Sequence, residues 1–167
     1  MSQKGTLIFF CGKMAAGKST LSKKMASQMG AILLSEDEWL ATIYPDEIND
    51  FHSYIKYSSR LKPLVEKHVQ ELLNSAISVV MDFPANTKNQ RQWFQSIYAD
   101  HHIPHKLIYI EASDELCLMQ IKKRRTTNPE RSHFDTEEVF HQVNSYFQPP
   151  TPEEGFDIEI VRREDSN

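Results

Sequence analysis

The sequence has few of the features that mark secreted, metal-stabilised or membrane proteins. Only two cysteines, Cys11 and Cys117, occur among 167 residues, and they are far apart in the chain. No zinc-site spacing is present, so we expect two buried free thiols in a reducing compartment. The apolar run at residues 7–11 is too short for the core of a signal peptide or for a membrane helix. We therefore expect a cytoplasmic protein without membrane association.

Internal repeats, low-complexity tracts, Gly/Ser linkers and an excess of basic residues are also missing. The length suits one domain, residues 1–167, and is too short for two ordinary ones. Acidic residues outnumber basic ones by 23 to 19, which gives a formal net charge of -4. A dedicated nucleic-acid binder normally has a basic surface, so this class is disfavoured. Nothing in the pattern indicates an oligomeric state.

Strand-like and helix-like segments alternate along the chain. The expected strands are short apolar runs at residues 6–11, 31–34, 77–82, 106–111 and 157–161. The expected helices lie at residues 19–29, 38–44, 51–75, 87–100, 113–125 and 135–146, with Pro63 starting or kinking part of the third. This alternation predicts an α/β fold in which a parallel sheet of about five strands has helices on both faces. Ligand sites in such folds lie at the carboxyl ends of the strands.

A phosphate-binding loop (P-loop) follows the first expected strand. Gly12, Gly17, Lys18 and Ser19 match the pattern G-x-x-x-x-G-K-[ST] in full, between a strand and a helix. The glycines let backbone N–H groups face phosphate oxygens, and the helix N-terminus adds its positive dipole end. The residues expected to bind nucleotide are Gly12, Lys13, Met14, Ala15, Ala16, Gly17, Lys18, Ser19 and Thr20. An ordinary glycine turn is the alternative interpretation.

Within this loop, Lys18 is expected to act on the β- and γ-phosphates, and the Ser19 hydroxyl to coordinate Mg²⁺. No Asn-Lys-x-Asp guanine-reading motif follows, so ATP is favoured over GTP. Asp82 ends an apolar strand in the Walker-B form and is the second candidate for holding Mg²⁺. A carboxylate that simply makes a turn at a strand end is the alternative for Asp82.

Two carboxylates follow the second expected strand and are candidates for a general base. Glu36 or Asp37 would accept the proton of an attacking hydroxyl as the phosphoryl group leaves ATP. The alternative is structural, because Ser35 and Glu38 have the spacing of a capping box that starts a helix.

The order of these motifs resembles that of a small P-loop kinase family that includes chloramphenicol phosphotransferase, zeta toxins and the kinase domain of polynucleotide kinase. The resembling segments span most of the chain: residues 12–20, 33–37 and 79–82, then Asn86, Arg91 and Arg124. The resemblance implies a three-layer P-loop NTPase fold with Asp37 as the base. It also implies that Asn86 and Arg91 position the acceptor. The alternative for the last pair is that Thr87 caps a helix and Arg91 is a solvated charge on it.

Basic residues surround a polar loop at residues 126–133 and predict a lid at about residues 124–135. Arg124 continues the stripe of Cys117 and Ile121, and Arg124 or Arg131 is expected to stabilise the charge on the transferred phosphoryl group. The family has two arginines spaced by four on this helix, but the first position here is Gln120. The alternative is that these cations complement the dipole of a helix C-terminus.

The segment at about residues 38–75 is expected to form a helical insertion on the substrate side. Its aromatic residues suit a ring or an amphipathic small molecule, although any core would use them as well. Polynucleotide kinases carry an arginine where this chain has Leu40, so a nucleic-acid acceptor is disfavoured. The sequence predicts an ATP-dependent kinase acting on a hydroxyl of a small or medium-sized molecule. The alternatives are a nucleotide-dependent ATPase or switch acting through a partner, and a zeta-like toxin that phosphorylates a nucleotide sugar.

Overall fold

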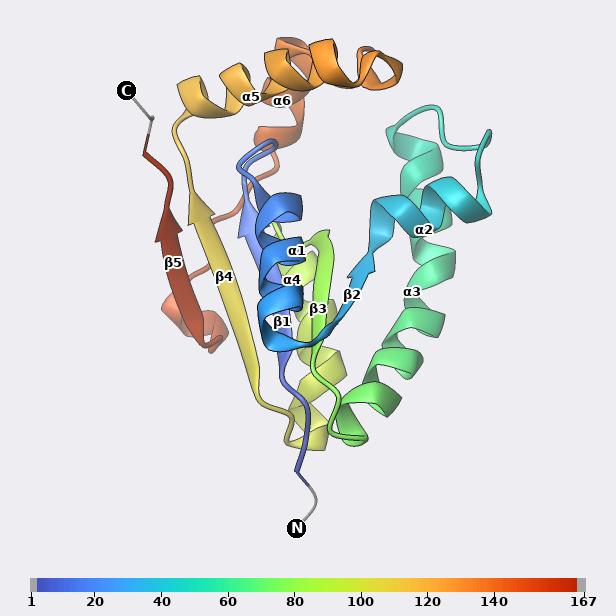
Figure 1. The fold of residues 1–167 in the computed structure, drawn as a ribbon, viewed down its shortest axis with the longest axis vertical. Coiled ribbons are helices and arrows are strands. Elements are labelled where there is room, and N and C mark those ends of the chain that lie inside the picture. Colours follow the sequence, from blue (N-terminus) through green and yellow to red (C-terminus); the bar gives the residue numbers. More distant parts are fainter. Residues whose placement is uncertain (1–2, 165–167) are drawn as a thin grey trace.

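The computed structural model describes residues 3–164 and confirms the predicted layered architecture (Figure 1). Within this range five strands form one parallel sheet in the order β2-β3-β1-β4-β5. The strands are β1 (Leu7–Gly12), β2 (Ile32–Ser35), β3 (Val79–Pro84), β4 (His105–Glu111) and β5 (Ile158–Arg162). Because β1 lies in the middle of the sheet, the loop that follows it opens at the centre of the carboxyl edge.

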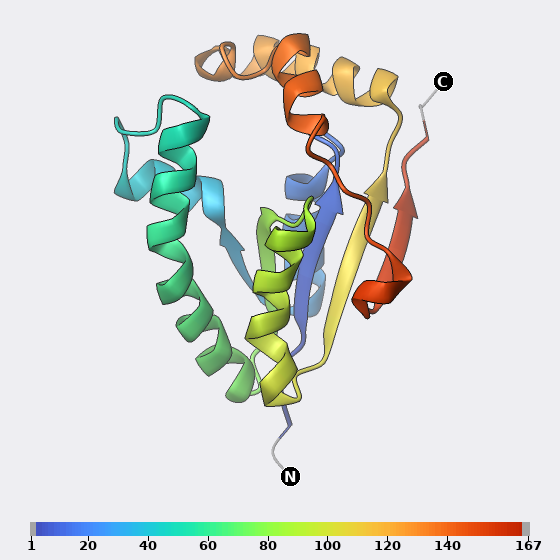
Figure 2. The same ribbon diagram turned by 180° about the vertical axis from the view of Figure 1, so that it is seen from behind.

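Six α-helices in the described part of the chain connect these strands. They are α1 (Lys18–Met29), α2 (Glu36–Ile43), α3 (Phe51–Asn74), α4 (Lys88–Tyr98), α5 (Asp114–Thr127) and α6 (Glu137–Asn144). Figures 1 and 2 show α1 on one face of the sheet, α3 and α4 on the opposite face, and α5 and α6 above the carboxyl ends of the strands. Within residues 3–164, no helix has the length and apolar character needed to cross a bilayer.

The core has two parts, one on each face of the sheet, because side chains alternate along β1. Leu7, Phe9 and Cys11 face the cluster that includes α3 and α4. Ile8 and Phe10 face the cluster that includes α1, α5 and α6. All five are buried, which explains why the strand is apolar at consecutive positions. Cys11 and Cys117 are buried free thiols, as predicted.

Local signals in the sequence set many helix ends correctly. The α1 helix ends at Gly30, which has the left-handed φ of 63° and donates its N–H to Ala26 and Ser27. Ser35, Thr87 and Ser113 each accept a backbone N–H at the start of a helix. These caps fix where α2, α4 and α5 leave the carboxyl edge of the sheet.

Two local predictions were wrong in part. Pro63 lies inside the continuous α3 and starts no separate helix, so of the two alternatives only a kink at Pro63 stays a prediction; the helix holds there because the core buries Leu61 and Val65 beside it. The polar loop expected at residues 126–133 is partly helical, since α5 continues to Thr127 and the 3₁₀ helix η2 covers Pro129–Arg131.

Candidate active site

The P-loop leaves β1 at the carboxyl edge and turns directly into α1. Gly17 adopts a φ of 104°, which strains any residue with a Cβ atom. Nη1 of Arg163 also comes close to Gly17 and donates to the Ala16 carbonyl at 2.9 Å. The backbone conformation of the loop is therefore what favours glycine at this position.

Lys18 is held at the front of this loop. Its Nζ donates to the carbonyl of Gly12 at 2.5 Å and to that of Lys13 at 3.1 Å. Burial lowers the pKa of Lys18, and the positive charge of Arg124 acts in the same direction. The loop thus places a partly desolvated ammonium against its own carbonyls, and a charge of this kind attracts phosphate oxygens.

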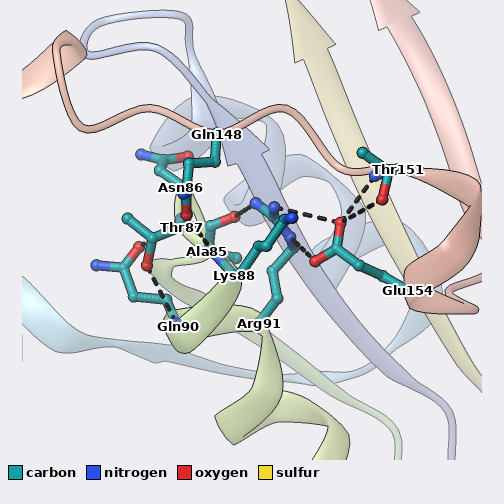
Figure 3. Close-up of polar contacts among 9 residues, drawn as sticks. All are labelled: Ala85, Asn86, Thr87, Lys88, Gln90, Arg91, Gln148, Thr151 and Glu154. Carbon is teal, nitrogen blue, oxygen red and sulfur yellow. Dashed lines mark hydrogen bonds and ion pairs between the residues drawn. The ribbon is translucent and has the colours of Figure 1, made fainter.

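Two asparagine side chains hold the first arm of the loop, residues 12–14. Oδ1 of Asn86 accepts the N–H of Gly12 at 2.9 Å, and Oδ1 of Asn144 accepts the N–H of Met14 at 3.3 Å. Asn86 is itself fixed, because its N–H donates to Gln90 and its carbonyl accepts the N–H of Gln148, both at 2.8 Å (Figure 3). The sequence suggested Asn86 as an acceptor contact, and the structure directs its side-chain oxygen to the P-loop instead.

Ser19 and Asp82 meet beside the loop. Asp82 lies next to Ser35 in the β2–β3 ladder, and its carboxylate interacts with the Ser19 hydroxyl. Burial raises the pKa of Asp82, while the bond from Ser19 lowers it. No group of three or more His, Cys, Asp or Glu side chains with metal-site geometry occurs in residues 3–164. Mg²⁺ needs no such cage, because it is held by one or two carboxylates together with phosphates and water, so the pair fits it.

The two candidate bases differ sharply in their surroundings. Glu36 is buried, and its carboxylate accepts the hydroxyls of Tyr54 and Ser58, the latter at 2.8 Å. Burial raises its pKa. Asp37 is exposed in the first turn of α2, close enough to Asp82 for its charge to raise the Asp82 pKa. Glu36 therefore fastens α2 to α3, whereas the Asp37 carboxylate is open to solvent.

The predicted lid residues lie at the end of α5 and beyond it. Arg124 forms an ion pair of 3.1 Å with Asp135, which is fully buried. This contact holds Arg124 over the site, where its charge acts on Lys18. The backbone of Arg131 belongs to η2, but its side chain lies outside what the structure describes. The assignment of Arg131 to catalysis stays a prediction.

The aromatic residues expected to line an acceptor pocket belong largely to the core. Trp39, Tyr44, Tyr54 and Tyr57 pack against the cluster on the α3 and α4 face. Phe51 differs, since 60% of its surface is exposed. The alternative interpretation of these aromatics as core residues therefore fits most of the segment.

Arg91 is taken up by contacts inside the protein. Its side chain is fully buried on α4, and its Nε donates to Oε1 of Glu154 at 2.8 Å. Its Nη1 donates to the carbonyl of Ala85 at 3.0 Å (Figure 3). Glu154 lies in the 3₁₀ helix η3 (Pro152–Glu154) and also accepts the N–H of Thr151 at 2.7 Å. The geometry corrects the expectation of an acceptor contact: Arg91 fastens η3 to α4.

We predict that Arg91→Met lowers the free energy of unfolding by roughly 3–5 kcal/mol, because Glu154 then loses its buried partner. Glu154→Gln should also destabilise, and the double variant should lose less than the two single losses added together. Urea unfolding of the four proteins measures this cycle. Strictly additive losses would show that the two side chains are not coupled.

Sequence reasoning missed three residues that make long-range contacts: Asn144 and Arg163, which reach the P-loop, and Glu154, which reaches Arg91. Each reaches its partner across a large separation, such as 130 positions between Met14 and Asn144. No spacing pattern marks contacts of this kind, because they depend on how the elements pack.

The fold and these residues define a P-loop domain. The chain matches the AAA_33 family, described as an AAA domain, over residues 7–150, and it belongs to that family. A comparison with curated protein sequences gave no match.

Solved structures share the fold at low sequence identity. A protein of Chloroflexus aurantiacus J-10-fl, described as a kinase candidate, is 20% identical with a TM-score of 0.74, covering 97% of this chain and 87% of its own. The APS kinase CysC of Mycobacterium tuberculosis, solved with AMPPNP and APS, is 17% identical with a TM-score of 0.66, covering 99% and 92%. Kti12 of Chaetomium thermophilum, solved with ADP-AlF3, is 15% identical with a TM-score of 0.69, covering 96% and 90%. The narrower resemblance to chloramphenicol phosphotransferase, zeta toxin and polynucleotide kinase stays a prediction.

Proposed function

We propose that this protein is a phosphotransferase that moves the γ-phosphoryl group of ATP to a hydroxyl group of a small or medium-sized molecule. One observation carries the proposal: an exposed carboxylate, Asp37, lies beside the Ser19–Asp82 pair at the same sheet edge as the P-loop lysine. A nucleotide-binding loop alone needs no such carboxylate. A transfer reaction does, because the attacking hydroxyl must lose its proton.

Each residue has a separate part in the reaction. The P-loop amides and Lys18 bind the phosphates and neutralise the charge on the leaving oxygen of ADP. Ser19 and Asp82 would hold Mg²⁺, which would supply positive charge to offset that of the phosphates. Arg124, fixed by Asp135, adds positive charge on the lid side.

The transfer reaction consists of one bond formed, one bond broken and one proton moved to Asp37. The acceptor oxygen forms a bond to the γ-phosphorus as the bond between that phosphorus and the β–γ bridging oxygen breaks. The acceptor proton passes to the carboxylate of Asp37, and ADP leaves with the electrons of the broken bond. The products are the phosphate monoester and ADP, and Asp37 returns its proton to solvent.

A screen for the acceptor tests the proposal. We expect that the protein, ATP–Mg and a mixture of hydroxyl-bearing metabolites yield a product heavier by one phosphoryl group in mass spectrometry. GTP–Mg should be the poorer donor, since the chain has no guanine-reading motif. ADP that accumulates at the same rate with and without the metabolites, with no phosphorylated product, would instead indicate hydrolysis.

A further inference from the structure

Asn144 brings the lid side of the molecule into contact with the P-loop. It is the last residue of α6, and its Oδ1 accepts the N–H of Met14 at 3.3 Å. Phe140, one turn earlier, is fully buried in the core and fixes the helix. The carboxamide of Asn144 is therefore held against the first arm of the loop and is not free in solvent.

The other half of this carboxamide has an unused donor. Nδ2 of Asn144 is buried and has no hydrogen-bond partner among the described residues. Leaving a buried donor unpaired is costly, so a donor of this kind normally meets an acceptor that the protein itself does not supply. A phosphate oxygen in the adjacent P-loop has the chemistry of such an acceptor.

The neighbours of Asn144 indicate which phosphate this is. Met14 belongs to the same arm as Gly12 and Lys13, whose carbonyls hold Nζ of Lys18. Lys18 is the residue that serves the β- and γ-phosphates, so this arm lies at the terminal end of the nucleotide. The charge of Arg124 also acts on Lys18, which places the lid cation at the same end.

We propose that Asn144 is a nucleotide-binding residue whose Nδ2 donates to the γ-phosphate of ATP while its Oδ1 keeps the N–H of Met14. This contact makes the site prefer ATP to ADP and ties α6, the helix that follows the predicted lid segment, to the presence of the γ-phosphate. The inference rests on the proposed function, because it needs ATP in the P-loop.

The test compares Asn144→Asp with a matched control, Gln142→Glu. Asn144→Asp keeps an oxygen for Met14 but replaces the donor by a charged acceptor. Gln142 is exposed on the same helix, so its variant makes the same change from amide to carboxylate at a distance from the loop. Titration calorimetry with a non-hydrolysable ATP analogue and with ADP, both with Mg²⁺, gives two dissociation constants for each protein.

We expect Asn144→Asp to weaken the ATP analogue relative to ADP by roughly 10–100-fold, the usual range for a hydrogen bond to a charged group. Gln142→Glu should keep the parent ratio. Asn144→Ala, which adds no charge, should also lose preference for the analogue, and melting curves without nucleotide show whether each variant is folded. If the parent binds both nucleotides and the folded variants keep its ratio, the role of Asn144 is wrong and the proposed function stands. If the parent binds neither nucleotide, both proposals fail.

Discussion

Lys18→Ala is expected to lower phosphoryl transfer by roughly 10²–10³-fold, the cost of removing one preorganised charge-stabilising donor. The ammonium lies between the carbonyls of Gly12 and Lys13 in a partly desolvated loop, where its charge acts strongly on phosphate. Burial already lowers the pKa of Lys18, so its charged form is not a strong stabiliser, and its removal should leave the melting temperature near that of the parent. Steady-state kinetics and thermal melting measure the two effects.

Lys24→Ala is the matched control, since Lys24 is an exposed lysine on the same helix. Its turnover should equal that of the parent. A folded Lys18→Ala protein with parental turnover would contradict the role of the P-loop lysine in phosphoryl transfer. A protein that has lost both turnover and its melting transition would instead assign Lys18 a structural role.

Features carried by contiguous residues were predictable from the sequence. The fully apolar run in β1 indicated a strand buried on both faces, and the P-loop pattern gave a turn whose chemistry is encoded within eight positions. Asp82 could be placed near the P-loop because the predicted strand ended there, and it does lie toward the carboxyl end of β3, where parallel strands share one edge of the sheet. Ser35 lies at the same edge of the sheet, since it pairs with Asp82 in the observed register.

Features that depend on distant packing were not predictable in this way. Arg91 was expected either to meet the acceptor or to be solvated, and it does neither, because Glu154 meets it from 63 positions away. Arg163 reaches the Ala16 carbonyl across 147 positions. A single sequence has no local period that marks such pairs, so the long-range supports of the loop emerge only when the elements are packed together.

The choice between Glu36 and Asp37 combines both kinds of information. Their position after β2 placed both carboxylates at the site, but sequence spacing gave no reason to separate them. Packing separates them, because the hydroxyls of Tyr54 and Ser58 on α3 take up the Glu36 carboxylate. The Asp37 carboxylate stays exposed.

Asp37→Asn is expected to lower transfer to the identified acceptor by roughly 10²–10⁴-fold, the usual contribution of a general base. The amide keeps the shape of the side chain and removes its basicity. Helix capping is not the cause of any loss, because Ser35 is the N-cap of α2 and accepts the N–H of Glu38 at 3.4 Å. Affinity for ATP–Mg should barely change, since Lys18, Ser19 and the loop amides are intact. Single-turnover kinetics and calorimetry measure the two quantities.

Glu38→Gln is the control that isolates this role. Glu38 is exposed in the same first turn, so its neutralisation removes the same favourable interaction with the helix dipole, about 0.3–1 kcal/mol, without touching the base. If Glu38→Gln and Asp37→Asn lower transfer equally, the loss comes from α2 and not from proton transfer. If Asp37→Asn transfers at the parental rate, the kinase proposal fails. Phosphate release without an acceptor, unchanged in Asp37→Asn, would then favour a hydrolytic switch, because water attack in such a protein proceeds without this carboxylate.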